Sequence, residues 1–202
     1  LPGGHRIGVC GSAVIKNGEM TGFGAIGSLC IRVARDVRIS PARLLPELTE
    51  SCLILGAPGA GKTTLLRACI RALSGNNERV CVCDDRSEIS AMSEGIAQFD
   101  LGPQTDVLAG LCKSEGMTLL LRAMNPTWIA ADEITAQPDL SAMEQISYCG
   151  VKLLATAHAK DRQELLTRPL YRELLSLGIF KRFFILQPDR QFTVEEVVAC
   201  SA

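Results

Sequence analysis

One eight-residue stretch has the residue types and spacing to bind a phosphate chain. Residues 56–63 read GAPGAGKT and fit the pattern G-x-x-x-x-G-K-[ST]. Glycines let backbone N–H groups wrap around a phosphate at the positive end of the following helix. Lys62 is expected to reach the β- and γ-phosphates, and the Thr63 hydroxyl to help hold Mg²⁺. We therefore expect ATP and Mg²⁺ here, with these nucleotide-binding residues: Gly56, Ala57, Pro58, Gly59, Ala60, Gly61, Lys62, Thr63 and Thr64.

The residues on either side of this loop favour the same interpretation. Residues 52–55 form an apolar run typical of a buried strand, and residues 62–73 have helical apolar spacing that stops at Ser74-Gly75. Strand, glycine-rich turn and helix are the context that the motif requires. The alternative is an ordinary turn rich in glycine and proline before a helix, and the complete motif in this context argues against it.

A pair of carboxylates follows a second apolar run. Residues 128–133 read WIAADE. In this Walker B pattern Asp132 would bind Mg²⁺ through water, and Glu133 would polarise the water that attacks the γ-phosphate. Two adjacent acids at a strand end also occur as a solvated turn. The P-loop earlier in the chain favours the catalytic interpretation.

Another acidic segment follows the predicted strand at 80–83. Residues 80–88 read VCVCDDRSE. One interpretation places Asp85 or Glu88 near the Mg²⁺ or the attacking water, with Arg86 balancing their charge. The alternative is a helix N-terminus capped by Ser87, where acids interact favourably with the helix dipole.

A histidine ends the apolar run at 153–158, which reads LLATAH. At a strand tip beside Thr156, His158 could sense the γ-phosphate and transmit its presence to the rest of the molecule. The alternative is a structural histidine. His5 is assigned no role.

From Ser40 onward the pattern alternates between strand and helix. Strands are predicted at 52–55, 80–83, 127–131, 151–155 and 183–187, and helices at 62–73, 114–124, 139–149 and 162–176. Such alternation predicts an α/β fold with a parallel sheet and helices on both faces. Ligands of such sheets bind beyond the carboxyl ends of the strands, where every motif described above is expected to lie.

The residues before Ser40 form a β-rich pattern. Two short strands are predicted within 7–15, interrupted at Gly11-Ser12, and Asn17-Gly18 indicates a hairpin turn. A half-buried strand is predicted at 29–35. This piece is too small to fold alone. We therefore expect part of a β-rich N-terminal domain and a linker at 1–39, and a P-loop domain at 40–202. The first residue, Leu1, leads us to expect a preceding segment.

Composition narrows the classes of function. The 202 residues include 21 basic and 22 acidic residues, for a net charge of −1, and only 4% are aromatic. This argues against a broad nucleic-acid-binding surface. Nine cysteines occur without a C-x-x-C pair, so free thiols in a reducing cytosol are expected, with Cys81 and Cys83 in the core. No apolar run approaches the ~18 residues of a transmembrane helix.

Taken in order, these motifs resemble the stage III sporulation protein AA family, ATPases of endospore-forming bacteria that are similar to the hexameric ATPases of type II and type IV secretion. The resemblance spans nearly the whole chain. It rests on the following segments: GHRIG at 4–8, SLCIRVAR at 28–35, GKTTLLR at 61–67, DRSEI at 85–89, TDVL at 105–108, KSEGM at 113–117 and TAH at 156–158.

The resemblance implies a RecA-like core preceded by an N-terminal domain, assembled into a hexameric ring with nucleotide between the two domains. It makes Arg32 and Arg35 candidate γ-phosphate contacts. It also implies a cytoplasmic ATPase on the mother-cell side, which powers a transport or channel complex between mother cell and forespore and has membrane proteins of the same operon as partners. Two departures are Asp85, where the family pattern has Glu, and residues 134–136, where it has a glycine.

Three functions remain open from the sequence. The first is a motor ATPase that drives a membrane-embedded complex, and the second is a nucleotide-gated scaffold with negligible turnover. The third is a nucleic-acid motor, for which near-neutral charge and few aromatic residues offer little support. Glu133 favours the motor, because a switch needs no water-polarising base. The expected catalytic residues are Glu133, Asp85, Glu88, His158, Arg32 and Arg35.

Overall fold

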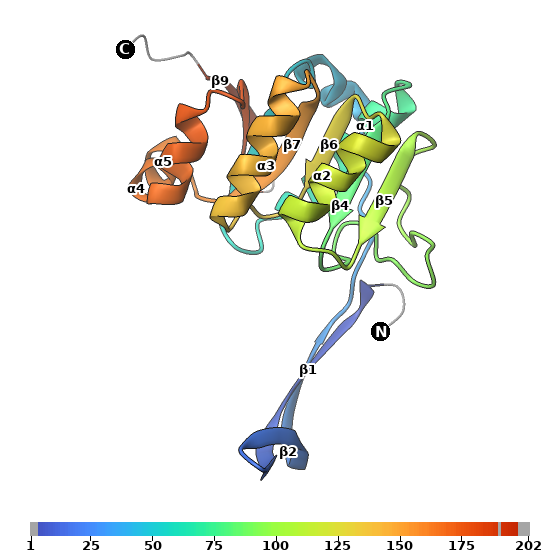
Figure 1. The fold of residues 1–202 in the computed structure, drawn as a ribbon, viewed down its shortest axis with the longest axis vertical. Coiled ribbons are helices and arrows are strands. Elements are labelled where there is room, and N and C mark those ends of the chain that lie inside the picture. Colours follow the sequence, from blue (N-terminus) through green and yellow to red (C-terminus); the bar gives the residue numbers. More distant parts are fainter. Residues whose placement is uncertain (1–3, 190, 198–202) are drawn as a thin grey trace.

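A seven-stranded sheet forms the core of the computed structural model, which describes residues 4–189 and 191–197 (Figure 1). Its strand order is β5-β4-β6-β7-β3-β8-β9. Every neighbouring pair from β5 to β8 is parallel, and β9 pairs antiparallel with β8. The strands are β3 (Cys52–Gly56), β4 (Val80–Asp84), β5 (Thr105–Ala109), β6 (Trp128–Ala131), β7 (Lys152–His158), β8 (Arg182–Leu186) and β9 (Phe192–Glu196).

Helices cover both faces of this sheet, as predicted. On β3, Leu53 and Leu55 pack in one hydrophobic cluster while Cys52 and Ile54 pack in the other. A strand that is buried on both faces is apolar at every position, which explains the continuous run CLIL. One face carries α1 (Lys62–Gly75) and the short 3₁₀ helices Pro41–Arg43 and Leu45–Glu47, and the other carries α2 (Lys113–Met124), α3 (Gln137–Tyr148), α4 (Arg162–Thr167) and α5 (Pro169–Ser176).

The parallel pairing brings four strand ends to one edge of the sheet. Cys83 on β4 pairs with Ala131 on β6, and Ala131 pairs with Ala155 on β7. Ala157 on β7 pairs in turn with Leu55 on β3. The residues that follow these positions therefore lie together beyond the carboxyl ends of the strands, where α/β sheets bind ligands.

Three predictions about the core need correction. The helix predicted at 162–176 is two helices, because Pro169 disfavours a helical conformation at Arg168, whose φ is −101° and ψ 125°. The edge strands β5 and β9 were not predicted. Their half-exposed sequences TDVLA and FTVEE lack the continuous apolar run of the central strands. Because of β9, the sheet is mostly rather than wholly parallel.

A β-hairpin precedes the core in the chain. It extends away from the core on the side where the parallel strands have their carboxyl ends, the side toward which the arrowhead of β5 points (Figure 1). It consists of β1 (Arg6–Lys16) and β2 (Glu19–Arg32), paired antiparallel. The predicted turn at Asn17-Gly18 is confirmed, with φ of 53° and 83°. Contrary to prediction, β1 is one strand, and its irregularity near Gly11 is absorbed as shifts in register.

The strand predicted at 29–35 ends earlier, at Arg32. Arg32 pairs with Arg6, the first residue of β1, so no partner strand remains beyond it. Instead, the N–H of Ala34 donates to Nδ1 of His5 at 3.1 Å. The assignment of residues 1–39 to a separate domain stays a prediction.

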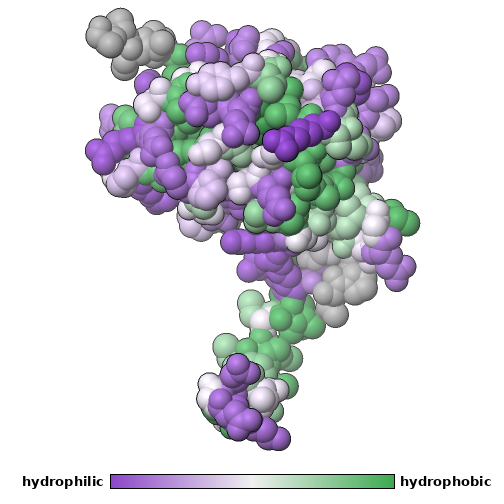
Figure 2. Space-filling view, in the orientation of Figure 1, coloured by the Kyte–Doolittle hydropathy of each residue, from purple (hydrophilic) through white to green (hydrophobic). Residues whose placement is uncertain are grey.

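Much of the hairpin surface is apolar, as the green atoms between its free end and the core show, while the free end also carries hydrophilic atoms (Figure 2). Its exposed large hydrophobic side chains are Ile7, Val14, Ile15, Met20, Phe23, Ile26, Leu29 and Ile31. In the core, by contrast, the large apolar side chains are mostly buried. The hairpin thus exposes large apolar side chains to solvent, whereas the core buries them.

Two further properties concern the cysteines and the helices of the described residues. The eight cysteines within residues 4–189 and 191–197 are free thiols. Cys81 and Cys83 are buried in the core, and burial raises their thiol pKa values to about 11 and about 12. No helix in those same residues is long and apolar enough to cross a membrane.

Candidate active site

The loop between β3 and α1 has the backbone shape that its glycines predict. Gly59 and Gly61 have φ of 76° and 104°, a region that glycine enters without steric cost. Nothing lies within 4 Å of a Cβ built on either residue, so conformation rather than space requires glycine there. Gly61 is the N-cap of α1, and the first N–H groups of that helix lie beside the loop. The loop therefore has the form of an anion-binding site.

Lys62, the first residue of α1, is buried with its ammonium group directed into the loop. Its Nζ donates to the carbonyl oxygens of Gly56 at 2.9 Å and Ala57 at 3.1 Å, and lies 2.6 Å from Nδ1 of His158. Burial lowers the pKa of Lys62, while the nearby Asp132 and Glu133 carboxylates act in the opposite direction. The loop thus holds a cation where a phosphate chain would lie.

The side chains that could hold a metal lie immediately next to Lys62. The Thr63 hydroxyl donates to Oδ2 of Asp132 at 2.6 Å. The other carboxylate oxygen of Asp132 accepts a hydrogen bond from the Thr156 hydroxyl, which in turn accepts from the N–H of Glu133 at 2.9 Å. Thr156 therefore fixes both acidic residues from β7.

These oxygens suit Mg²⁺, which prefers hard oxygen ligands and binds through one or two carboxylates together with substrate phosphates. Within the described residues, no group of three or more His, Cys, Asp or Glu side chains could hold a metal ion by itself. A site built from Thr63 and Asp132 would therefore depend on phosphate oxygens to complete it.

Glu133 and His158 form a hydrogen-bonded pair across the end of the sheet. The Nε2 atom of His158 lies 3.0 Å from Oε1 of Glu133. Because the Lys62 ammonium can only donate, Nδ1 of His158 accepts from it, and Nε2 then carries the proton donated to Glu133. Lys62, His158 and Glu133 thus form one chain of hydrogen bonds.

The backbone of Glu133 lies in the left-handed region, with φ of 47°. For a residue other than glycine this conformation costs about 1–3 kcal/mol. It persists because the N–H of Glu133 donates to the Thr156 hydroxyl and the N–H of Ile134 donates to the carbonyl of Thr156 at 3.1 Å. The strand that carries His158 therefore also sets the position of the Glu133 carboxylate.

The acidic segment after β4 is organised by Asp84 rather than by a helix. Asp84 is 2% exposed, and its carboxylate accepts hydrogen bonds from the N–H groups of Glu88, Ile89 and Ser90 and from the Ser90 hydroxyl. The alternative prediction of a helix capped by Ser87 is wrong, because Ser87 has φ of 53° and no helix follows it. Four hydrogen bonds to one carboxylate make a rigid turn.

This turn directs Glu88 and Asp85 to different places. Glu88 faces the hairpin and forms an ion pair with Arg6. Asp85 lies 3.1 Å from Nζ of the buried Lys113, in a small hollow beside Asp132 and Glu133. Arg86 lies 4.0 Å from the Asp85 carboxylate and 3.7 Å from the Glu133 carboxylate.

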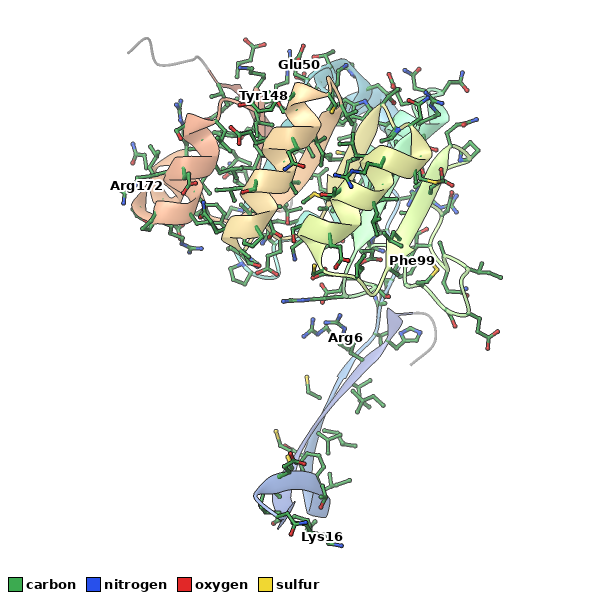
Figure 3. The ribbon with its side chains drawn as sticks, viewed as in Figure 1. Arg6, Lys16, Glu50, Phe99, Tyr148 and Arg172 are labelled. Atoms are coloured by element: carbon green, nitrogen blue, oxygen red, sulfur yellow. The ribbon has the colours of Figure 1, made fainter. Side chains whose placement is uncertain are left out.

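The hairpin supplies the opposite wall of the site. Arg6 and Arg32 face each other at its base, and Nη2 of Arg6 donates to the carbonyl of Arg86 at 2.9 Å. Figure 3 shows Arg6 where the hairpin meets the core. Arg35 lies beyond the end of β2, and its carbonyl accepts a hydrogen bond from Arg67. Of the two predicted arginines, only Arg32 lines the cleft.

Together these elements enclose a cleft of about 430 Å³, here called the phosphate cleft. It brings together Glu88, Glu133, His158 and Arg32 with the P-loop, and leaves Asp85 and Arg35 outside its lining. Its lining residues are Arg6, Arg32, Pro58, Gly59, Gly61, Lys62, Thr63, Thr64, Arg86, Glu88, Asp132, Glu133, Thr156 and His158.

Sequence reasoning assigned no role to Arg6 or Lys113. Both lie in segments that carried the family resemblance, GHRIG and KSEGM, but their partners Glu88 and Asp85 are distant in sequence. A signal for Lys113 was available, because a lysine that begins a helix next to an acidic segment can balance its charge. No local pattern identifies Arg6.

Comparisons with known proteins identify the family to which the chain belongs. The family model described as sporulation stage III, protein AA matches residues 1–197. The stage III sporulation protein AA of Bacillus subtilis (strain 168) is 34% identical over 195 residues, which cover 92% of this chain and 64% of that protein. An uncharacterized protein, ycf45, of Cyanidium caldarium is 31% identical over 180 residues, covering 85% of this chain and 50% of the relative. The chain thus spans less than two thirds of the length of these relatives.

Solved structures show the same fold at low sequence identity. The Legionella pneumophila ATPase DotB aligns with a TM-score of 0.61 and 18% identity, covering 94% of this chain and 56% of that one. The pilus retraction motor PilT, solved with bound ADP, aligns with a TM-score of 0.59 and 12% identity, covering 98% and 65%. These likenesses establish the RecA-like α/β core. On the family match and the sequence identity, the chain belongs to the sporulation stage III protein AA family.

Proposed function

We propose that this chain hydrolyses ATP at the phosphate cleft and acts as a motor ATPase of the secretion type. The observation that carries the proposal is the hydrogen-bonded chain from Lys62 through His158 to Glu133, next to the contact between Thr63 and Asp132. It joins a phosphate-binding cation to a carboxylate that can act as a base. A site that only bound nucleotide would have no need of that carboxylate.

In the proposed reaction the P-loop N–H groups and Lys62 bind the β- and γ-phosphates, and Thr63 and Asp132 hold Mg²⁺. Bound Mg²⁺ would neutralise charge that develops on the phosphate oxygens. Glu133 orients the attacking water and accepts its proton. His158 holds the Glu133 carboxylate through Nε2 and contacts Lys62 through Nδ1, so that it links the phosphate-binding group to the base.

The charge around the base supports this assignment. Arg86 lies 3.7 Å from Glu133, and Lys113 lies 3.1 Å from Asp85. In this proposal the two cations reduce repulsion among the carboxylates, and Arg32 stabilises charge on the γ-phosphate from the hairpin side. Glu88 holds Arg6 at the cleft, and Asp85 holds Lys113 next to the carboxylates of Asp132 and Glu133.

Family membership supports a proposal for the cellular role. We propose a cytoplasmic ring, expected to be hexameric, that is recruited to a membrane complex on the mother-cell side and powers transport between mother cell and forespore. Membrane proteins of the same operon would be its partners. The names of two solved structures with this fold, a pilus retraction motor and a type IV secretion ATPase, fit a mechanical role.

A pair of variants tests the assignment. Lys62→Ala should weaken ATP binding by roughly 100-fold or more, because hydrogen bonds to charged groups are worth about 1.5–3 kcal/mol each. Glu133→Gln should keep ATP affinity within a few-fold and reduce turnover by about 10²–10⁴, because the amide fits but is not a base. Binding is measured by titration calorimetry and turnover by phosphate release.

Lys16→Ala and Glu50→Gln, exposed and away from the cleft, are the matched controls (Figure 3). Unchanged ATP affinity in Lys62→Ala would contradict the P-loop assignment. ATP binding without measurable phosphate release by the parent, alone or with a membrane partner, would favour the nucleotide-gated scaffold instead.

A further inference from the structure

We propose that Arg67 and Arg71 on α1 position Arg32 at the phosphate cleft by binding the segment that joins the hairpin to the core. This segment, residues 33–40, runs from the end of β2 to the first 3₁₀ helix and is called the connecting segment here. Neither Arg67 nor Arg71 lines the phosphate cleft. The inference rests on the proposed ATP hydrolysis, and it assigns two positioning residues that act on the reaction through Arg32 rather than by contact with nucleotide.

Arg67 binds the backbone of the connecting segment. It is 7% exposed, and its Nη1 donates to the carbonyl oxygen of Arg35 at 3.0 Å. Its guanidinium also lies 4.4 Å from the centre of the Phe99 ring, at the edge of the core from which the hairpin extends (Figure 3). Because burying a charged group is costly unless it is hydrogen-bonded, Arg67 and the Arg35 carbonyl hold each other in place.

Arg71, one helical turn further along α1, binds a side chain of the same segment. Its Nη2 lies 2.9 Å from Oδ1 of Asp36, and its Nε donates to the carbonyl oxygen of Asp100 at 2.8 Å. Residues four apart on a helix lie on one face, so the two arginines form a single binding surface. The connecting segment is therefore held at two successive residues, Arg35 and Asp36.

The position of Arg32 follows from this attachment. Arg32 precedes Arg35 by three residues, and three residues of extended chain span at most about 11 Å. Binding of the Arg35 carbonyl thus keeps the end of β2 close to α1. Lys62 and Thr63, which would bind phosphate and Mg²⁺, lie in the first turn of that helix and line the phosphate cleft together with Arg32. One helix therefore carries the phosphate-binding groups and also holds the arginine opposite them.

The hairpin has a second attachment to the core, which is more exposed. Arg6 on β1 forms an ion pair with Glu88, and the two side chains are 40% and 31% exposed. In the pair between Arg71 and Asp36, the side chains are 17% and 23% exposed. Ion pairs that are exposed to solvent contribute little, because water and salt screen them. The contacts on α1 should therefore hold the hairpin more firmly than the ion pair on β1 does.

Loss of the Arg67 side chain tests the proposal. Arg67→Ala should reduce turnover by about 10- to 100-fold, the range expected for residues coupled in one network, and leave ATP affinity within about 3-fold. In a chain that already carries Arg32→Ala, the same change should reduce turnover by less than about 2-fold, because Arg67 acts through Arg32. Single-turnover release of labelled phosphate measures these slow rates, and titration calorimetry measures affinity. Arg122→Ala, at an exposed position of α2, is the matched control and should alter neither quantity.

Asp36→Asn removes a charge from the connecting segment without a change in α1, and so tests the same attachment in a chain whose core is intact. Turnover should fall by about 3- to 10-fold, again only when Arg32 is present. Hydrogen exchange followed by mass spectrometry gives a readout that does not require activity. In Arg67→Ala, backbone amides of residues 33–39 should exchange at least about 10-fold faster than in the parent, while those of β3 and β6 stay unchanged.

Two results would overturn the proposal. One is an equal loss of turnover from Arg67→Ala with and without Arg32, which a purely structural role would produce. The other is unchanged exchange of the connecting segment in Arg67→Ala. A parent chain that hydrolyses no ATP would instead overturn the proposed function, and hydrogen exchange would still show whether α1 holds the connecting segment.

Discussion

The two walls of the phosphate cleft are built in different ways. The core wall places Lys62 at the start of α1, and Asp132 and Glu133 directly after the buried strand β6. Hydrogen bonds through Thr63, Thr156 and His158 connect these residues. The hairpin wall brings Arg6 and Arg32 from two strands whose large apolar side chains are exposed. An isolated two-stranded hairpin is at best marginally stable in water. The core wall is therefore fixed by its own packing, whereas the hairpin wall is not.

This difference suggests a division of labour. The groups that would bind phosphate and activate water belong to the core wall, where buried strands and hydrogen bonds fix their positions. Arg6 and Arg32 belong to the hairpin wall, which is not fixed by packing of its own. Their contribution should therefore depend on where the hairpin lies relative to the core.

The largest loss of turnover from a change in the hairpin wall is expected for Arg32→Ala. If Arg32 stabilises charge on the γ-phosphate, its loss should reduce turnover by about 10³–10⁵, the contribution of arginine fingers in related chemistry. Arg35→Ala is the matched control and should have little effect, because Arg35 does not line the cleft. Phosphate release at saturating ATP measures both.

A larger loss for Arg35 than for Arg32 would contradict this intrachain assignment and indicate that Arg35 serves a neighbouring subunit. That possibility has its own test. Mixing Lys62→Ala subunits with Arg35→Ala subunits should then restore activity, because some sites would receive both missing groups. A co-assembled mixture that stays inactive would exclude donation between subunits.

A smaller effect is expected for His158→Ala. His158 joins Lys62 to Glu133 but is not expected to anchor the nucleotide, so ATP affinity should stay within a few-fold. Turnover should fall by about 10- to 100-fold, since hydrogen bonds to charged groups are worth about 1.5–3 kcal/mol. Calorimetry and phosphate release separate the two quantities. Equal turnover in variant and parent would make His158 a structural residue.

The same contrast explains how much the sequence could predict. Lys62 was found from the P-loop motif. Asp132 and His158 were found because each lies at the end of an apolar run, and parallel pairing brings such strand ends together whatever the details of packing. Arg6 could not be found, because its partner Glu88 is 82 positions away and only the folded chain brings them together. The edge strands were missed for a related reason, since β5 and β9 are specified by pairing with β4 and β8 rather than by an apolar run.

The smallest effect is expected for an exposed apolar residue of the hairpin. Ile26 on β2 is 62% exposed, whereas Leu66 on α1 is fully buried. Leu66→Ala should reduce the free energy of unfolding by about 2–5 kcal/mol, because it removes buried methyl groups and leaves a cavity. Ile26→Ser should change it by less than about 0.5 kcal/mol, since exposed positions seldom contribute more. Urea denaturation of both variants measures the two values. A loss of more than about 2 kcal/mol for Ile26→Ser would mean that the hairpin is packed against other protein in solution, and the two walls of the cleft would then be equally fixed.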